Sequence, residues 1–314
     1  MLQLTAPLSF EPIFVERVWG GRKLESFYGK KLPRQKQIGE SWEIVDRPEA
    51  QSMVRGGALA GRSLHDLWVN FRDEIFGTVA NSPRFPLLIK LLDCREKLSL
   101  QVHPPAQVSR ELGGEPKTEA WFIADAAPDA ELYLGFNQPT DAPTFERALK
   151  AGTAAELVRR VLVKSGNAFL VPSGRMHSIG AGNLIVEVQE NSDTTYRVFD
   201  WDRVDEHGRA RDLHVTEAMR CIDFSDFQAH PNPVAGESLV FNPLFAIDRW
   251  KIDAPRELVP EGKFAIGFCL SGELNCAGTR YATGEFFLLP ARADDRNVQS
   301  SDPNSELLRI TIPT

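Results

Sequence analysis

Short apolar runs bounded by Gly, Pro, Asn or Asp dominate the hydrophobic pattern of the chain. Examples are residues 85–92 (FPLLIKLL), 168–172 (AFLVP) and 183–188 (NLIVEV). Runs of about four to eight residues between turn signals predict β-strands. The 23 glycines and 21 prolines are spread along the chain, a distribution typical of sandwiches and barrels. The pattern therefore predicts a mainly β fold.

Helical periodicity is confined to three segments, at residues 63–76, 144–163 and 216–222. In the middle segment, apolar residues recur at helical spacing among charged ones, and Gly152 interrupts the pattern. This predicts an amphipathic pair of helices broken at that glycine. Because the segment lies between two strand-rich regions, we expect residues 139–164 to form a small helical insertion.

Two segments share one turn pattern, a Gly followed by five mostly apolar residues and a Pro. They are Gly166–Pro172 and Gly284–Pro290, and they indicate an internal repeat. Only the first segment continues to a histidine, so we expect one active and one structural barrel. The predicted divisions are 1–138 and 165–230 for the catalytic barrel, 139–164 for the insertion, and 231–314 for a degenerate C-terminal barrel.

Composition and charge describe an ordinary globular chain, with 42% hydrophobic and 25% charged residues. The net charge of -7 disfavours nucleic acid and anionic membranes as partners. The four cysteines form no CxxC pair, which favours reduced thiols. The N-terminus lacks the pattern of a signal peptide, and no run of apolar residues is long enough to span a membrane. We expect a cytoplasmic protein, and no pattern predicts its oligomeric state.

Two of the six histidines lie beside other residues that can bind a metal. Alternation along the strand puts Ser99, Gln101 and His103 on one face. A polar face directed into a barrel must be satisfied, and a metal ion would do this for Gln101 and His103 together. His177 follows Pro172 and Gly174, which shape a tight turn that presents a single imidazole.

The segment that ends at His177 resembles the second signature of the cupin superfamily, although Ala181 stands where an asparagine is often found. The first cupin signature is only partly present, with His103 as a ligand and Glu119 as the candidate carboxylate. The resemblance implies two cupin-type jelly-roll β-barrels with a small helical insertion. Two imidazoles, a carboxylate and an amide oxygen suit Zn²⁺ and would also accept Fe²⁺, Mn²⁺ or Co²⁺.

Several longer segments are similar to type I mannose-6-phosphate isomerases of the short bacterial form. They are residues 19–21 (WGG), 39–43 (GESWE), 85–93 (FPLLIKLLD), 99–104 (SLQVHP), 117–121 (KTEAW), 172–178 (PSGRMHS) and 191–197 (NSDTTYR). The resemblance implies an isomerase that interconverts mannose 6-phosphate and fructose 6-phosphate through a cis-enediol(ate). It also implies one zinc per chain, bound by Gln101, His103, Glu119 and His177.

The resemblance further implies catalytic and substrate-binding residues around this metal. Arg197 matches an arginine that the family places over the reacting sugar, although an ion pair with Asp200 or Asp202 is the alternative. Ser99 and Lys117 would lie beside the ligands and face the substrate. They are the first candidates for the phosphate, and Arg175 is the second.

Glu187 is the candidate base, since it lies ten residues before Arg197 as in the family. It shares a strand face that could point into the barrel, where apolar neighbours would raise its pKa. Lys117 and a zinc-bound water are the competing candidates. Two other functions stay open at this point, an Fe-dependent cupin oxygenase and a metal-containing cupin that binds a phosphosugar without turnover.

Overall fold

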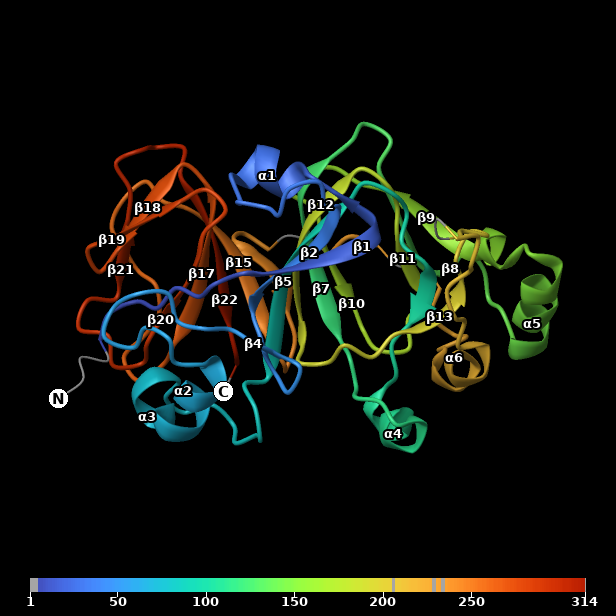
Figure 1. The fold of residues 1–314 in the computed structure, drawn as a ribbon, viewed down its shortest axis with the longest axis horizontal. Helices are drawn as coiled ribbons and strands as arrows, with labels where there is room; N and C mark the ends of the chain where they lie inside the picture. The colour runs from blue at the N-terminus through green and yellow to red at the C-terminus, as the bar shows by residue number, and fades with distance from the viewer. Residues whose placement is uncertain (1–4, 205–206, 228–229, 233–234, 314) are drawn as a thin grey trace.

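Two pairs of antiparallel β-sheets make up the protein, as the computed structural model in Figure 1 shows for residues 5–204, 207–227, 230–232 and 235–313. In the first pair, the larger sheet has the order β1 (Ile13–Gly21), β2 (Ile38–Ile44), β5 (Leu87–Cys94), β12 (Asn183–Glu190), β7 (Glu119–Ala126), β10 (Ala168–Val171). The smaller sheet has the order β13 (Tyr196–Phe199), β6 (Leu100–Val102), β11 (His177–Ile179), β8 (Glu131–Phe136), β9 (Val158–Leu162). The prediction of a mainly β fold is confirmed.

The second pair is formed by the C-terminal strands, drawn in orange and red in Figure 1. One sheet has the order β14 (Ser238–Phe241), β15 (Ala246–Lys251), β22 (Glu306–Thr311), β17 (Ala265–Ser271), β20 (Phe286–Leu289). The other has the order β16 (Arg256–Glu257), β21 (Asn297–Gln299), β18 (Glu273–Cys276), β19 (Thr279–Ala282). A short ribbon of β3 (Asp46–Arg47) and β4 (Ala50–Gln51) completes the strands of the described residues.

The two segments of the predicted repeat occupy matching places in the two pairs. β10 lies at the edge of its sheet beside β7, and β20 lies at the edge of its sheet beside β17. Gly166 and Gly284 precede these strands with φ angles of 89° and 91°, which residues with a side chain rarely adopt. The same glycine requirement at both places agrees with an internal repeat.

The helices of the described residues are short and lie outside the sheets. They are α1 (Lys23–Tyr28), α2 (Leu64–Asn70), α3 (Arg72–Ile75), α4 (Ala106–Ser109), α5 (Ala142–Ala151) and α6 (Val215–Cys221), with 3-10 turns at Arg110–Leu112 and Ala154–Leu157. Asp141 caps α5 by accepting a hydrogen bond from the Thr144 amide, and Gly152 ends the helix in the left-handed conformation. None of these helices has both the length and the hydrophobicity needed to span a membrane.

The second helix predicted within 144–163 is wrong. After Gly152 the chain makes one 3-10 turn and then forms β9, which pairs with β8. Val158 is buried, and exposure then alternates along β9, the period of a strand rather than of a helix. The β-branched Val158 and Val161 favour this pairing. The insertion is therefore one helix followed by an edge strand.

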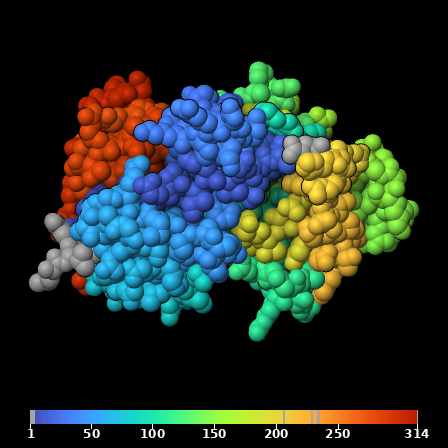
Figure 2. All heavy atoms as spheres, in the orientation of Figure 1, coloured from blue at the N-terminus to red at the C-terminus, as the bar shows by residue number. Residues whose placement is uncertain are grey.

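The two sheet pairs share a hydrophobic core at their junction. Its buried cluster includes Leu8, Trp68, Phe85, Phe264 and Leu288, which come from both halves of the chain. Figure 2 shows N-terminal residues, in blue, spread across this face between the red C-terminal region and the green and yellow strands. Early residues thus pack on the C-terminal pair, as the backbone bridge between Leu8 and Leu288 illustrates. The domain boundaries at 138, 164 and 230 stay a prediction.

A bulge in β1 explains why glycine occurs in the WGG and GESWE segments. Glu16 and Gly21 both pair with Ile38, so residues 17–20 leave the ladder with β2. A Cβ on Gly20 would lie 2.4 Å from the Gly39 amide nitrogen, and a Cβ on Gly39 would lie 2.6 Å from the Arg17 Cβ. Both positions therefore require glycine, and the bulge brings Arg17 against the start of β2.

Candidate active site

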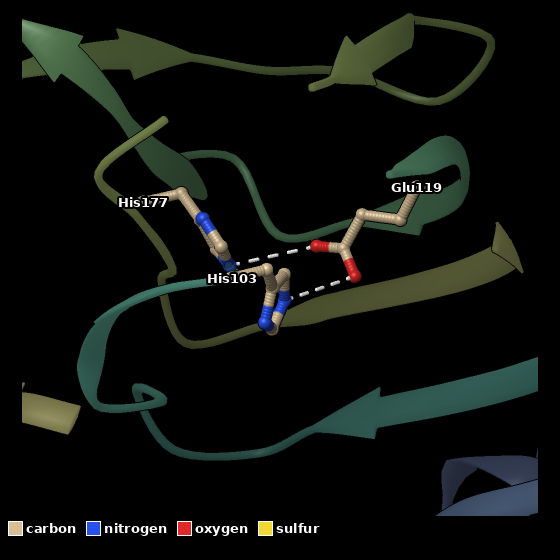
Figure 3. Close-up of side chains that lie close together, drawn as sticks. All are labelled: His103, Glu119 and His177. Atoms are coloured by element: carbon tan, nitrogen blue, oxygen red, sulfur yellow. Dashed lines mark ion pairs between the residues drawn. The ribbon is translucent and has the colours of Figure 1, made fainter. Parts of the chain in front are cut away.

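Three buried side chains from three strand ends converge in the first sheet pair. Glu119 begins β7, His177 begins β11, and His103 directly follows β6. Each is 1% exposed, and their ligand atoms all lie within 4.8 Å of one another. Figure 3 shows both imidazoles facing the two carboxylate oxygens. The His177 and Gln101 residues pair across β11 and β6, which places Gln101 beside this group.

Hydrogen bonds determine which histidine nitrogens carry protons. His103 Nδ1 lies 2.9 Å from the Thr194 carbonyl oxygen, and His177 Nδ1 lies 2.8 Å from that of Arg175. Because a carbonyl can only accept, each Nδ1 donates, and each Nε2 presents a lone pair. Burial lowers the pKa of His103 to about 3 and also lowers that of His177, so both rings are neutral.

The Nε2 lone pairs of both histidines therefore face the carboxylate oxygens of Glu119, which are hydrogen-bond acceptors as well. His103 Nε2 lies 3.2 Å from Glu119 Oε2, and His177 Nε2 lies 3.5 Å from Glu119 Oε1. Neither His103 Nε2 nor Glu119 Oε2 has a hydrogen-bond partner among the described residues, although Lys117 Nζ lies 2.9 Å from that oxygen. A divalent cation would satisfy all three residues, and the carbonyls that orient the imidazoles are the usual outer partners of metal-binding histidines.

A cavity of about 360 Å³ opens next to this cluster. It is lined by Glu16, Arg17, Val18, Trp19, Glu40, Lys90, Leu92, Leu98, Ser99, Gln101, Lys117, Glu187, Asp193, Thr195, Arg197 and Arg211. Most of the polar side chains that line it are charged. Five residues named from the sequence lie here, namely Ser99, Gln101, Lys117, Glu187 and Arg197.

Arg175 does not line this cavity. Its guanidinium binds both carboxylate oxygens of Asp226, at 2.7 and 2.9 Å, and donates to the Leu170 carbonyl oxygen at 2.9 Å. These partners occupy its donors and hold the turn before His177. The structure therefore gives Arg175 a structural place and does not bring it to the candidate substrate site.

Arg197 faces the cavity without an ion-pair partner among the described residues. The alternative pair with Asp200 does not form, because Arg211 binds both oxygens of that carboxylate at 2.7 and 2.6 Å. Arg203 also lies 3.2 Å from Asp200. Burial and the neighbouring charge of Arg211 lower the pKa of Arg197. An unneutralised, half-buried guanidinium in a cavity is suited to an anionic group of a ligand.

Glu187 also points to the cavity and is 4% exposed. Trp121 Nε1 donates to its Oε2 at 3.1 Å, and Lys90 Nζ lies 3.5 Å from its Oε1. Burial and the nearby charge of Glu119 raise the pKa of Glu187. A carboxylate with a raised pKa is suited to general-base chemistry.

Sequence reasoning gave no role to Lys90, although it lies at the centre of the buried charges. Its Nζ lies 3.7 Å from Glu40 and 3.8 Å from Asp193, in addition to Glu187. Burial disfavours its charge, but these carboxylates outweigh burial and raise the pKa of Lys90. Lys90 and Arg17 likewise overcome burial to lower the pKa of Glu40 to about 2. The sequence did contain one sign of this role, because Lys90 is a charged residue inside the apolar run 85–92.

Replacing Lys90 by methionine is expected to lower the free energy of unfolding by about 3 kcal/mol, because buried carboxylates would lose their shared cation. Urea denaturation followed by circular dichroism measures the change. Lys36→Met is the control, because Lys36 forms an exposed pair with Glu16 and should shift stability by less than about 1 kcal/mol. Equal midpoints for the two variants would contradict the central role of Lys90.

The fold and the site together define a class of β-sandwich proteins with a buried cation site beside a charged, ligand-sized cavity. The family described as phosphomannose isomerase type I, catalytic domain, matches residues 8–119. Mannose-6-phosphate isomerase ManA of Bacillus subtilis is 36% identical over 91% of this chain and 93% of its own length. Mannose-6-phosphate isomerase of Streptococcus mutans is 33% identical over 89% of this chain and 92% of its own length.

A solved structure agrees with these sequences. The crystal structure of mannose 6-phosphate isomerase from Bacillus subtilis superposes with a TM-score of 0.86 at 31% identity, covering 98% of this chain and 100% of that one. The chain therefore belongs to the type I mannose-6-phosphate isomerase family, and it is an isomerase. The family resemblance stated from the sequence motifs is confirmed.

Proposed function

We propose that this enzyme interconverts mannose 6-phosphate and fructose 6-phosphate through a cis-enediol(ate), using one zinc ion held by Gln101, His103, Glu119 and His177. The observation that carries the proposal is the convergence of three buried acceptors next to Gln101 and Lys117, which line a charged cavity. The substrate is a small phosphosugar, and its negative charge matches the arginines that line that cavity.

The donor set supports a borderline metal ion. Two imidazole nitrogens and a carboxylate are typical ligands of zinc, and they would also accept other divalent ions. Gln101 completes the set through its amide. Its Nε2 lies 3.3 Å from His177 Nε2 while its Oε1 accepts from Ser99, so rotating the amide by a half-turn directs the oxygen at the cluster. When bound, the ion would stabilise negative charge on substrate oxygens as a Lewis acid.

Glu187 is proposed to move the proton between the two reacting carbons of the sugar. A base that removes a proton from one carbon and returns it to the neighbouring carbon must reach both from one side. Glu187 belongs to the central strand β12, and Trp121 and Lys90 hold its carboxylate in place. A general base is most effective when its pKa lies near the working pH, and the raised pKa of Glu187 changes in that direction.

Arg197 is proposed to bind the oxygen on which charge develops, since its guanidinium stays cationic and has no ion-pair partner among the described residues. Ser99 and Lys117 are proposed to contact the sugar near the metal. Ser99 Oγ lies 3.0 Å from the side-chain amide of Gln101, and Lys117 pairs with Glu119. Both side chains are therefore tied to the ligand cluster, and they would orient the reacting end of the substrate.

We also propose a cytoplasmic location, without nucleic-acid or membrane partners. The four cysteines, Cys94, Cys221, Cys269 and Cys276, are buried free thiols, as a reducing compartment maintains them. The acidic net charge of -7 supports the absence of polyanionic partners.

Removing the metal is expected to abolish formation of fructose 6-phosphate from mannose 6-phosphate. The test incubates metal-analysed protein with the substrate before and after dialysis against a chelator, and then restores zinc. Activity should disappear and return, because the Lewis acid has been removed and replaced. Turnover that persists in metal-free protein would overturn the zinc assignment. Phosphosugar binding without conversion in zinc-loaded protein would indicate a binding protein instead.

A further inference from the structure

Residues of both edge strands of the first sheet pair line the active-site cavity. β1 is the edge of the larger sheet, and β13 is the edge of the smaller one. Arg17 on β1 and Arg197 on β13 both line the cavity. Their charges act on each other, since Arg17 contributes to the lowered pKa of Arg197. Two cations from opposite sheets thus share one opening.

Arg17 is only partly neutralised. Its Nε donates to Glu40 Oε1 at 2.7 Å, and that carboxylate also faces Lys90. The two terminal nitrogens of Arg17 have no partner among the described residues, and its side chain is 31% exposed. A guanidinium held at Nε by a carboxylate is fixed in direction and keeps its terminal donors for a second acceptor.

The bulge in β1 and the glycine at position 39 determine where the Arg17 side chain lies. The bulge at residues 17–20 takes Arg17 out of the regular ladder, and the side chain packs on Gly39, where a Cβ would lie 2.6 Å from the Arg17 Cβ. Bulges of this kind redirect side chains beside active sites. An ion pair with Glu40 alone would not require this departure from regular pairing.

Arg17 and the ligand Glu119 lie on strands that are well separated in the order of the larger sheet. From β7, which carries Glu119, the larger sheet continues through β12, β5 and β2 before it reaches β1. Neighbouring strands are about 4.8 Å apart, so, counted along the sheet, several strand widths separate Arg17 from Glu119. Ser99 and Lys117, by contrast, are tied to the ligand cluster. A hexose 6-phosphate carries its phosphate at the end opposite C1 and C2, the carbons that react.

We propose that Arg17 is the specificity-determining residue that binds the substrate phosphate at the β1 side of the cavity, away from the strand that carries Glu119. This inference rests on the proposed function for the identity of the phosphosugar. The terminal nitrogens of Arg17 donate two parallel hydrogen bonds to phosphate oxygens, while Arg197 acts on the sugar. Arg17 therefore governs affinity for the phosphorylated substrate, and Arg197 governs the rate of the chemical step.

The test compares zinc-loaded wild type with Arg17→Met, Arg17→Lys and the control Arg280→Met, whose exposed side chain pairs with Glu273 in the C-terminal region. Steady-state kinetics with mannose 6-phosphate and competitive inhibition by inorganic phosphate are measured for each. Arg17→Met should raise both KM and the inhibition constant of phosphate by about 10- to 100-fold, with kcat changed by less than about threefold. Arg17→Lys should lie between, because it keeps the charge and loses the paired donors.

Metal content and thermal unfolding are recorded for every variant, so that a misfolded protein is recognised. If Arg17→Met does not fold, Arg17→Lys is compared with the wild type instead. An unchanged inhibition constant for phosphate in a folded variant would overturn the inference. A fall in kcat with constant KM would also overturn it and would indicate a structural role through Glu40. Calorimetric titration with phosphate tests the role of Arg17 independently of turnover. A wild-type protein that binds phosphate without isomerising the sugar would refute the proposed function, but it would not contradict phosphate binding by Arg17.

Discussion

Replacing His177 by alanine is expected to release the metal and to lower turnover of mannose 6-phosphate by about 1,000-fold or more. His177 Nε2 is one of the three buried acceptors, and its Nδ1 is already committed to the Arg175 carbonyl oxygen. The variant would leave a cavity in place of the imidazole, with no donor atom for the metal. Losing several kcal/mol of charge stabilisation from a Lewis acid corresponds to a rate change of this size. His103→Ala should have the same effect.

Mass spectrometry of dialysed protein gives the metal content, and a coupled assay for fructose 6-phosphate gives the rate. His230→Ala is the control, because His230 is exposed and far along the chain from the ligand residues. It should keep both metal and turnover. Full metal content and normal rates in both His103→Ala and His177→Ala would remove these residues from the ligand set.

Local patterns could predict some parts of this site because the relevant spacing is short. His177 was found from a turn of glycines and proline, and Ser99, Gln101 and His103 were found from alternation along one strand. The structure brings these residues to one place, across the pairing of β6 with β11. Glu119 was found only through the family resemblance, because nothing in its own neighbourhood distinguishes it from a surface carboxylate.

The residues that sequence reasoning missed depend on long-range contacts. Lys90, Glu40 and Arg17 lie on three neighbouring strands, and each ion pair between them favours the charged form of both partners. No periodicity reveals such a network, since its members are separated by loops and helices. The ion pair that places Arg175 outside the cavity lining could not be predicted for the same reason, because its partner Asp226 follows 51 residues later.

The helix wrongly predicted over the end of 144–163 shows a related limit. Its apolar residues fit either period over so short a length, and pairing with β8 decided in favour of a strand. The mainly β fold was easier to predict, because many short apolar runs between turn residues all agree. Domain boundaries are harder, since residues near the N-terminus pack on the C-terminal sheets.

Replacing Glu187 by glutamine is expected to stop proton transfer while leaving the metal in place. The amide has the shape of the carboxylate and can still accept from Trp121 Nε1, and Lys90 keeps Glu40 and Asp193 as partners. It cannot act as a base at ordinary pH. Loss of a positioned base costs about 100- to 10,000-fold in rate. A normal metal content would separate this loss from damage to the ligand cluster.

The decisive measurement for Glu187→Gln is exchange of the substrate proton at C1 and C2 with solvent deuterium, followed by nuclear magnetic resonance. Glu146→Gln on α5 is the control, because Glu146 is exposed and outside the cavity. Exchange at the normal rate in Glu187→Gln would move the base to another group, with Lys117 as the next candidate. In the wild type, the working form of Glu187 is deprotonated, and burial raises its pKa. The rate should therefore fall as the pH is lowered, beginning above the range of an ordinary glutamate, and this limb should be absent from the residual activity of Glu187→Gln.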